Sequence, residues 1–244
     1  MTLTSRQKIA VKHCLGSKMK EKIQELDRRS LVPLVRSNRL TYLSDSKLCV
    51  LLESINEIND LGVKGCFIEA GVALGGSLVI ISGNCESRDV LAYDTFEMIP
   101  APTEDDPPEV HERYRIISSG QSLGIGGDLY YGYRNDLLSF VSDNIKNLAG
   151  INSYEHTELI PGLLQNTMRV DFPVAFAHID VDWYEPVRYS IQSIWPWVSI
   201  NGIVIFDDYR DWGGCKKAVD EFFGGQKDFL ADISGGNLKI KKIA

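Results

Sequence analysis

A series of short apolar segments, separated by stretches with helical character, constrains the fold more than any other feature of this sequence. Strands that are apolar on both sides are typical of a parallel sheet whose two faces are covered by helices. Five segments fit, and four of them end in an acidic residue or lead directly to glycine: CFIEA (66–70), DVLAYD (89–94), HTELI (156–160), VAFAHID (174–180) and GIVIFD (202–207). Helical stretches are predicted between them, at 76–83, 136–149, 185–198 and 213–223. The sequence therefore predicts a doubly wound α/β fold.

Elements at both ends of this core complete the expected domain. The segment 227–243 reads as two strands joined by Gly235-Gly236, which is a hairpin signal. We therefore expect a mostly parallel seven-stranded sheet with a terminal antiparallel hairpin strand. A helix that Ser44 or Asp45 can cap, and that Gly62 can end, is predicted before the first strand. Its apolar residues recur at helical spacing: Leu48, Leu51, Leu52, Ile55 and Ile58.

Two segments lie outside the core pattern. Residues 1–40 are expected to form a helical accessory segment, amphipathic over 5–29 and interrupted at Pro33, while 41–244 form the main domain. The stretch 97–131 is rich in Pro, Gly, Asp and Glu and is too long for a plain connection. We interpret it as a lid-like insertion or a subunit contact, with a disordered loop as the alternative.

Composition excludes several classes of protein. The 244 residues are 44% hydrophobic, which suits one large α/β domain. The sequence has neither a transmembrane-length apolar run nor a signal peptide, so we expect a cytoplasmic protein without a membrane partner. The net charge of −7 opposes the basic surface that nucleic acid requires. Five scattered cysteines without a CxxC pair favour small buried side chains over a disulfide or zinc framework.

A glycine-rich turn follows the first predicted strand, at the sheet end where ligands of doubly wound folds bind. Gly71 and Gly75 allow a tight turn and close approach of a ligand, but Ala73 breaks the GxGxxG dinucleotide pattern. Glu69 would repel a phosphate and could accept from an ammonium group. Asp94 ends the second strand, where an acid suits ribose hydroxyls. Together these features predict a nucleoside site.

Acidic residues also gather at the ends of two later strands. Asp180 ends the fourth predicted strand, and Asp207 and Asp208 follow the fifth. Adjacent parallel strands would bring these carboxylates together, where they repel one another unless a cation or shared protons intervene. Oxygen ligands select Mg²⁺, with Mn²⁺ or Ca²⁺ as substitutes. The alternative is that Asp207 and Asp208 merely open a loop; His178, two residues before Asp180, is either a structural residue or a base.

Five blocks in fixed order resemble the macrocin O-methyltransferase family, over about residues 36–224. They are RLTYLSDSKL (39–48), FIEAGVALGGS (67–77), YDTFEMIP (93–100), HIDVDWYEPV (178–187) and IVIFDDYRDWGGCKKAVDEF (203–222). The resemblance implies a class I, Rossmann-like methyltransferase of natural-product pathways, antibiotics among them, that methylates sugar or phenolic hydroxyls. The pattern from Glu69 to Ser77 also resembles the catechol-type, metal-dependent methyltransferases.

The resemblance also implies roles for particular residues. The metal carboxylates would be Asp180, Asp207 and Asp208. Catechol-type enzymes place a lysine base three residues after the first metal aspartate, but here that position is Trp183, which leaves Asp180 or His178. Contacts to S-adenosylmethionine are expected from the matching blocks, with Tyr42 and Ser44 closing over its methionine end: Tyr42, Ser44, Glu69, Ala70, Gly71, Gly75, Ser77, Asp94 and Thr95.

The sequence thus predicts an enzyme that uses S-adenosylmethionine and Mg²⁺, or Mn²⁺, to methylate a hydroxyl of a small molecule. A metal-dependent phosphoesterase and a nucleoside-binding module without catalysis are the alternatives, and each leaves one of the two residue clusters unexplained. A homodimer or higher homo-oligomer is expected, because the core fold needs neither the N-terminal segment nor the insertion. The sequence does not identify the acceptor or the pathway.

Overall fold

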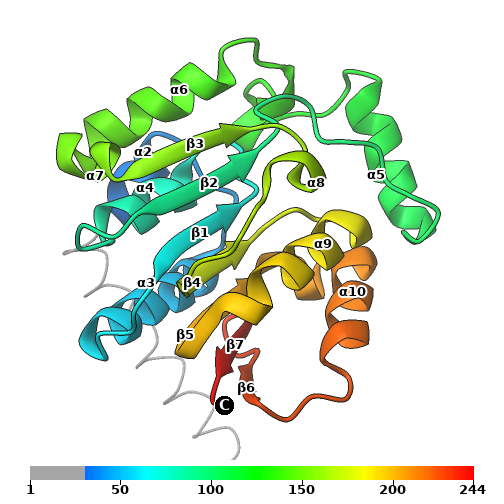
Figure 1. The fold of residues 1–244 in the computed structure, drawn as a ribbon. Helices are drawn as coiled ribbons and strands as arrows, with labels where there is room; N and C mark the ends of the chain where they lie inside the picture. Colours follow the sequence, from blue (N-terminus) through cyan, green and yellow to red (C-terminus); the bar gives the residue numbers. More distant parts are fainter. Residues whose placement is uncertain (1–30) are drawn as a thin grey trace, which may run out of the picture.

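A computed structural model describes residues 31–244 of the chain. Its centre is one twisted seven-stranded sheet in the order β3-β2-β1-β4-β5-β7-β6 (Figure 1). Strands β1 to β5 pair in parallel, and β7 is antiparallel to both of its neighbours. The strands are β1 (Cys66–Ala70), β2 (Val90–Asp94), β3 (Thr157–Pro161), β4 (Val174–Ile179), β5 (Val198–Phe206), β6 (Phe229–Asp232) and β7 (Leu238–Lys242). This is the doubly wound sheet with an antiparallel hairpin strand that the sequence predicts.

Helices cover both faces of the sheet (Figure 1). One layer consists of α2 (Val32–Ser37), α3 (Asp45–Asp60), α4 (Gly76–Gly83), α6 (Leu137–Asn144) and α7 (Ile151–Glu155). The other consists of α8 (Leu164–Thr167), α9 (Tyr184–Ile194) and α10 (Gly213–Phe223). Helix α5 (Pro108–Ser118) stands to one side, within the insertion.

Alternation along the strands divides the apolar side chains between two cores. Phe67 on β1 packs edge-on against Phe176 on β4, with 5.5 Å between ring centroids, in the core beneath α3 and α4. Its neighbour Ile68 faces the opposite core beneath α9 and α10. Both faces of β1 and β4 are therefore buried, which explains why these strands are apolar apart from Glu69 and His178.

Of the four helices predicted at 76–83, 136–149, 185–198 and 213–223, two have the predicted bounds, the second is divided into α6 and a π-helical turn (Ile145–Ala149), and the end of the third is wrong. Helices α4 and α10 have the predicted bounds, and the hydroxyl of Ser44 accepts from the backbone N–H of Lys47 to cap α3. The helix expected to reach residue 198 instead ends at Ile194. A 3₁₀ turn containing Pro196 follows, and β5 begins at Val198. Proline lacks the backbone donor that a continuing helix needs, so the strand starts earlier than expected.

The segments outside the core pattern are only partly within the described residues. The expected amphipathic helix at 5–29 lies outside them. Pro33 occupies the first turn of α2, where its missing N–H carries no penalty. The insertion 97–131 contains α5 and two 3₁₀ turns, at Ile125–Gly127 and Tyr131–Tyr133. Across residues 31–244, no helix has both the length and the apolar character needed to cross a membrane.

Gly71 ends β1 at a point where two chain segments nearly touch. Its φ is +87°, and a Cβ there would overlap the carbonyl oxygen of Asp180. The backbone N–H of Asp180 also donates to the carbonyl of Ala70, at 2.8 Å. The glycine therefore allows the turn after β1 to lie directly against the segment that follows β4.

We expect Gly71→Ala to lower the free energy of unfolding by about 3 kcal/mol, since both strain and overlap must be relieved. Gly127→Ala is the matched control: its φ is also +87° but no atom lies within 4 Å of the added Cβ. That variant should lose only about 1 kcal/mol, for backbone strain alone. Urea denaturation measures both, and equal losses would show that the contact between Gly71 and Asp180 is unimportant.

Candidate active site

A cavity opens at the carboxyl ends of β1, β2 and β4, where doubly wound folds bind their ligands. The insertion provides one wall, and the ends of the strands with the turns after β3 and β4 provide the rest. Residues from the strand ends and turns are Gly71, Tyr93, Asp94, Thr95, Gly162, Leu163, Leu164, Gln165, Asp180, Val181, Asp182, Trp183, Glu185 and Pro186. Residues from the insertion are Glu97, Ile99, Pro100, Ala101, Pro102, Thr103, Asp106 and Tyr131.

Asp94 holds the glycine-rich turn in place. Its Oδ2 accepts from the backbone N–H groups of Val72 and Ala73 at 2.7 and 3.1 Å, and its Oδ1 accepts from that of Phe96 at 2.7 Å. Burial raises the pKa of Asp94, and these three donors act against the shift. Asp94 and the neighbouring Thr95 line the cavity, so the carboxylate both orders the turn and borders the space for a ligand.

Gly71 also lines the cavity, but the remaining predicted cofactor residues do not. Glu69 and Ala70 are completely buried at the end of β1, and Ser77 is buried in α4. Gly75, with φ +84°, sits at the N-cap of α4. Tyr42 is half exposed and touches the ring edge of Tyr131. Ser44 caps α3. Their contacts with the cofactor remain predictions.

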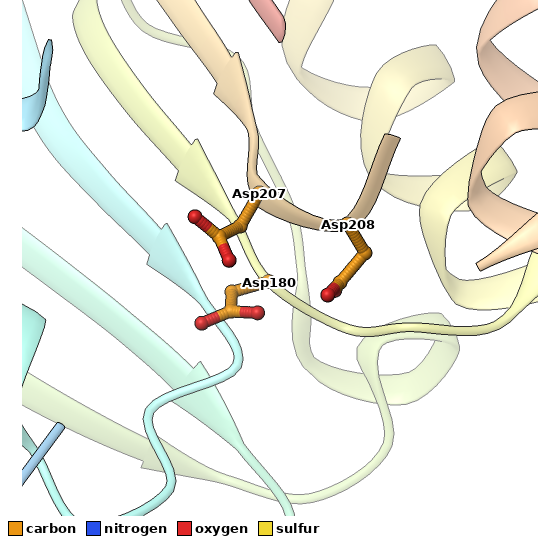
Figure 2. A group of neighbouring side chains, drawn as sticks. All are labelled: Asp180, Asp207 and Asp208. Carbon is orange, nitrogen blue, oxygen red and sulfur yellow. The ribbon is translucent and has the colours of Figure 1, made fainter. Parts of the chain in front are cut away.

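Three carboxylates converge beside the cavity, as the sequence predicts. Oxygen atoms of Asp180, Asp207 and Asp208 all lie within 4.8 Å of one another, where β4 and β5 end (Figure 2). Burial and the charges of Asp207 and Asp208 hold the pKa of Asp180 well above its usual range. Burial and the charge of Asp207 raise the pKa of Asp208 to about 7. The three groups destabilise one another's charged forms, which is the condition that a cation relieves.

Lys47 on α3 is a site residue that the sequence patterns did not reveal. Its Nζ lies 2.7 Å from Oδ2 of Asp207 and 2.6 Å from Oδ2 of Asp211, and its side chain is only 13% exposed. Burial alone would raise the pKa of Asp207, but His178 and Lys47 lower it. Its place in the family-like block 39–48, one turn after the Ser44 cap, is the one sequence feature that sets it apart, and this does not indicate its partner.

His178 lies in the interior and not on the cavity wall. Its Nδ1 is 3.0 Å from Oε1 of Glu69 and its Nε2 is 3.8 Å from Oδ1 of Asp207. Burial would lower the pKa of His178, but the two carboxylates raise it to about 9. The ring is completely buried and favours the protonated form, so its position does not suit a general base for a bound acceptor.

The cluster suits a hard divalent cation. Its candidate ligands are all carboxylate oxygens, the donors that Mg²⁺ and Mn²⁺ prefer. Oδ1 of Asp207 is buried without a hydrogen-bond partner in the described part of the chain, as expected of an atom that awaits a ligand. Among the described residues, this donor set includes neither histidine nor cysteine.

Two contacts pin the insertion to the segment after β4. The indole Nε1 of Trp183 donates to the carbonyl of Pro100 at 3.0 Å. Asp106 is buried and accepts from the backbone N–H of Tyr184 at 2.7 Å, so it satisfies a free donor in the first turn of α9. Trp183, which stands where catechol-type enzymes have lysine, therefore anchors the cavity wall.

The strand order, the ligand cavity at the carboxyl ends and the acidic residue after β2 define a protein of the class I methyltransferase fold. The profile of the macrocin O-methyltransferase family matches residues 6–234. The chain belongs to this family, which confirms the resemblance inferred from the sequence blocks.

Individual relatives agree. The chain is 26% identical over 200 residues to demethyldecarbamoylnovobiocin O-methyltransferase of Streptomyces niveus, covering 76% of this chain and 68% of the relative. It is 25% identical over 186 residues to 8-demethyl-8-(2,3-dimethoxy-alpha-L-rhamnosyl)-tetracenomycin-C 4'-O-methyltransferase of Streptomyces olivaceus, covering 71% and 64%. The structure of the O-methyltransferase NovP aligns with a TM-score of 0.67 at 23% identity, covering 84% of this chain and 83% of that chain.

Replacing Lys47 by methionine keeps most of its aliphatic length and removes the ammonium group from Asp207. Because a buried carboxylate then loses a charged partner, we expect the metal-free protein to lose about 3 kcal/mol of unfolding free energy at neutral pH. Lys216→Met breaks the exposed pair with Asp220 and should cost less than about 1 kcal/mol. Urea denaturation in EDTA measures the unfolding free energies of both variants. Similar losses would show that the buried pair of Lys47 and Asp207 stabilises the protein no more than an exposed pair does.

Proposed function

We propose that this protein is an S-adenosylmethionine- and Mg²⁺-dependent O-methyltransferase, which acts on a hydroxyl of a natural product, either a sugar or a phenol. One observation carries the proposal: a single cavity runs from Asp94 at the glycine-rich turn to Asp180 in the carboxylate cluster. A nucleoside bound at the turn and an acceptor bound at the cluster would therefore meet in one enclosed space. The names of the two curated relatives support a natural-product acceptor, and the rhamnosyl group in one of them supports a sugar.

The cofactor half of the site lies at the ends of β1 and β2. Asp94 would accept from a ribose hydroxyl through Oδ1, which has a second lone pair besides the one that accepts from Phe96, while Oδ2 continues to hold the N–H groups of Val72 and Ala73. Gly71, on the cavity wall, lets the ligand approach the backbone closely. Residues that hold the cofactor there would fix it relative to the acceptor, and such positioning is a large part of catalysis.

The acceptor half lies at the ends of β4 and β5. Asp180, Asp207 and Asp208 would hold the divalent cation, which supplies positive charge that lowers the pKa of the acceptor hydroxyl. Asp180 accepts the hydroxyl proton directly or through a water molecule, because it belongs to the cluster and also lines the cavity. The insertion encloses this half, and its pinning by Trp183 and Asp106 excludes water from the reacting groups.

The alternatives have less support. A phosphoesterase leaves Asp94 and the glycine-rich turn unused, and among the described residues that line the cavity there is no lysine or arginine to bind a phosphate. A nucleoside-binding module without catalysis leaves the carboxylate cluster unused. A cytoplasmic homo-oligomer remains our expectation for the assembled enzyme, and the insertion remains our candidate for the lid.

Asp94→Ala should weaken the binding of S-adenosylhomocysteine about tenfold or more, the value of one charge-assisted hydrogen bond. Asp89→Ala is the control, because Asp89 lies at the opposite end of β2 and its side chain is 83% exposed. Isothermal titration calorimetry measures both affinities. An unchanged affinity in the Asp94 variant would remove this residue from the cofactor site.

Removal of the divalent cation should abolish methyl transfer, and added Mg²⁺ should restore it. Asp180→Asn should slow transfer by about a hundredfold or more, because both cation binding and proton acceptance are affected. Asp182→Asn should be milder, since Asp182 lines the cavity but is not among the three converging carboxylates. The assay is methyl transfer to a catechol or sugar acceptor. Full activity in EDTA, and in the Asp180 variant, would mean that the carboxylates are structural.

A further inference from the structure

Three polar side chains form a buried row beneath the cavity, on three neighbouring strands. Glu69 on β1 is in register with His178 on β4, and His178 is in register with Ile205 on β5, two residues before Asp207. The His178 ring lies 3.0 Å from Glu69 through Nδ1 and 3.8 Å from Asp207 through Nε2. Glu69 and His178 are completely buried, and the Asp207 side chain is 5% exposed. The row joins the proposed cofactor half of the site to the proposed cation half.

Each member of the row has one buried atom without a hydrogen-bond partner among residues 31–244. These atoms are Oε2 of Glu69, Nε2 of His178 and Oδ1 of Asp207. Buried polar atoms are nearly always satisfied in native proteins, so three neighbouring atoms without a hydrogen bond make this row unusual. Two of the exceptions face each other, because Nε2 of His178 and Oδ1 of Asp207 are only slightly too far apart for a hydrogen bond.

Packing alone does not explain a histidine at this position. The remaining residues of β4 are apolar and buried, and an apolar residue in place of His178 would leave the Glu69 carboxylate and Oδ1 of Asp207 facing the protein interior. An uncompensated buried charge is costly, so the ring is needed to contact these two carboxylates. Because the ring does not line the cavity, it acts on the site through these two neighbours.

We propose that His178 is a positioning residue with a separate task for each ring nitrogen. Nδ1 holds Glu69 in the orientation that serves the cofactor, and Nε2 holds Asp207 in the orientation that serves the divalent cation. Lys47 occupies the other oxygen of Asp207, so the two basic side chains together fix the plane of that carboxylate. The inference rests on the proposed function, since it takes the cofactor and the cation as the ligands of the two halves.

Two substitutions separate the two tasks. The amide nitrogen of asparagine falls near the position of Nδ1, whereas that of the longer glutamine falls near Nε2. His178→Asn should therefore keep S-adenosylhomocysteine affinity within about twofold of wild type and weaken Mn²⁺ binding about tenfold, the value of one charge-assisted contact. His178→Gln should show the reverse pattern. Calorimetry measures S-adenosylhomocysteine, and electron paramagnetic resonance measures free Mn²⁺.

This crossed pattern distinguishes positioning from a structural role. If His178 had only a structural role, each substitution would weaken the affinities for S-adenosylhomocysteine and Mn²⁺ together, or would weaken neither. Either result would overturn the proposal. Wild-type protein that bound no S-adenosylhomocysteine would contradict the proposed function itself, which is a different outcome.

A measurement on the wild-type protein covers the case in which a variant does not fold. The chain has four histidines, so ¹⁵N labelling gives few imidazole signals, and complete burial protects the ring protons of His178 from exchange. S-adenosylhomocysteine should shift the Nδ1 resonance of His178, and Mg²⁺ should shift its Nε2 resonance. Resonances that stay unchanged on both additions would overturn the proposal.

Discussion

Repulsion among carboxylates at the ends of β4 and β5 is the constraint on which the rest of the site depends. Asp180 and Asp208 have raised pKa values because burial and their neighbours disfavour the charged form. Asp207 is the exception, because Lys47 from α3 and His178 from β4 lie beside it and lower its pKa. The fold therefore compensates the charge of Asp207 with its own basic side chains, whereas burial and the neighbouring acids dominate at Asp180 and Asp208. This division explains how such a cluster can persist within a folded protein before any ligand arrives.

The insertion and the sheet form one unit and not a core with a loose appendage. Two hydrogen bonds join the segment after β4 to the insertion. The indole of Trp183 donates to the carbonyl of Pro100, and the backbone N–H of Tyr184 donates to Asp106. The same segment carries Asp180 and Asp182. The insertion wall and these two carboxylates, which also line the cavity, are therefore positioned together.

The sheet and the carboxylate cluster were predictable from sequence because both depend on local patterns. Apolar strands such as β4 show their burial directly, and an acid at the end of a strand has a known place in a doubly wound sheet. Lys47 was not predictable, because it reaches Asp207 across 160 positions of sequence and no periodicity marks it. The role of His178 was equally hidden: the sequence places it near Asp180, but only the register of three strands puts it between Glu69 and Asp207.

The position of β7 has a consequence for the order in which the site is assembled. Although β7 follows β6 in the sequence, it lies between β5 and β6 and forms the outer partner of β5. The edge of β5 thus stays open during synthesis until residue 242 has left the ribosome, whereas β1, β2 and β3 can already pair. The strand end that carries Asp94 can therefore form on the nascent chain, whereas the strand that leads to Asp207 and Asp208 gains its outer partner only afterwards. The carboxylate cluster is thus among the last parts of this sheet edge to be completed.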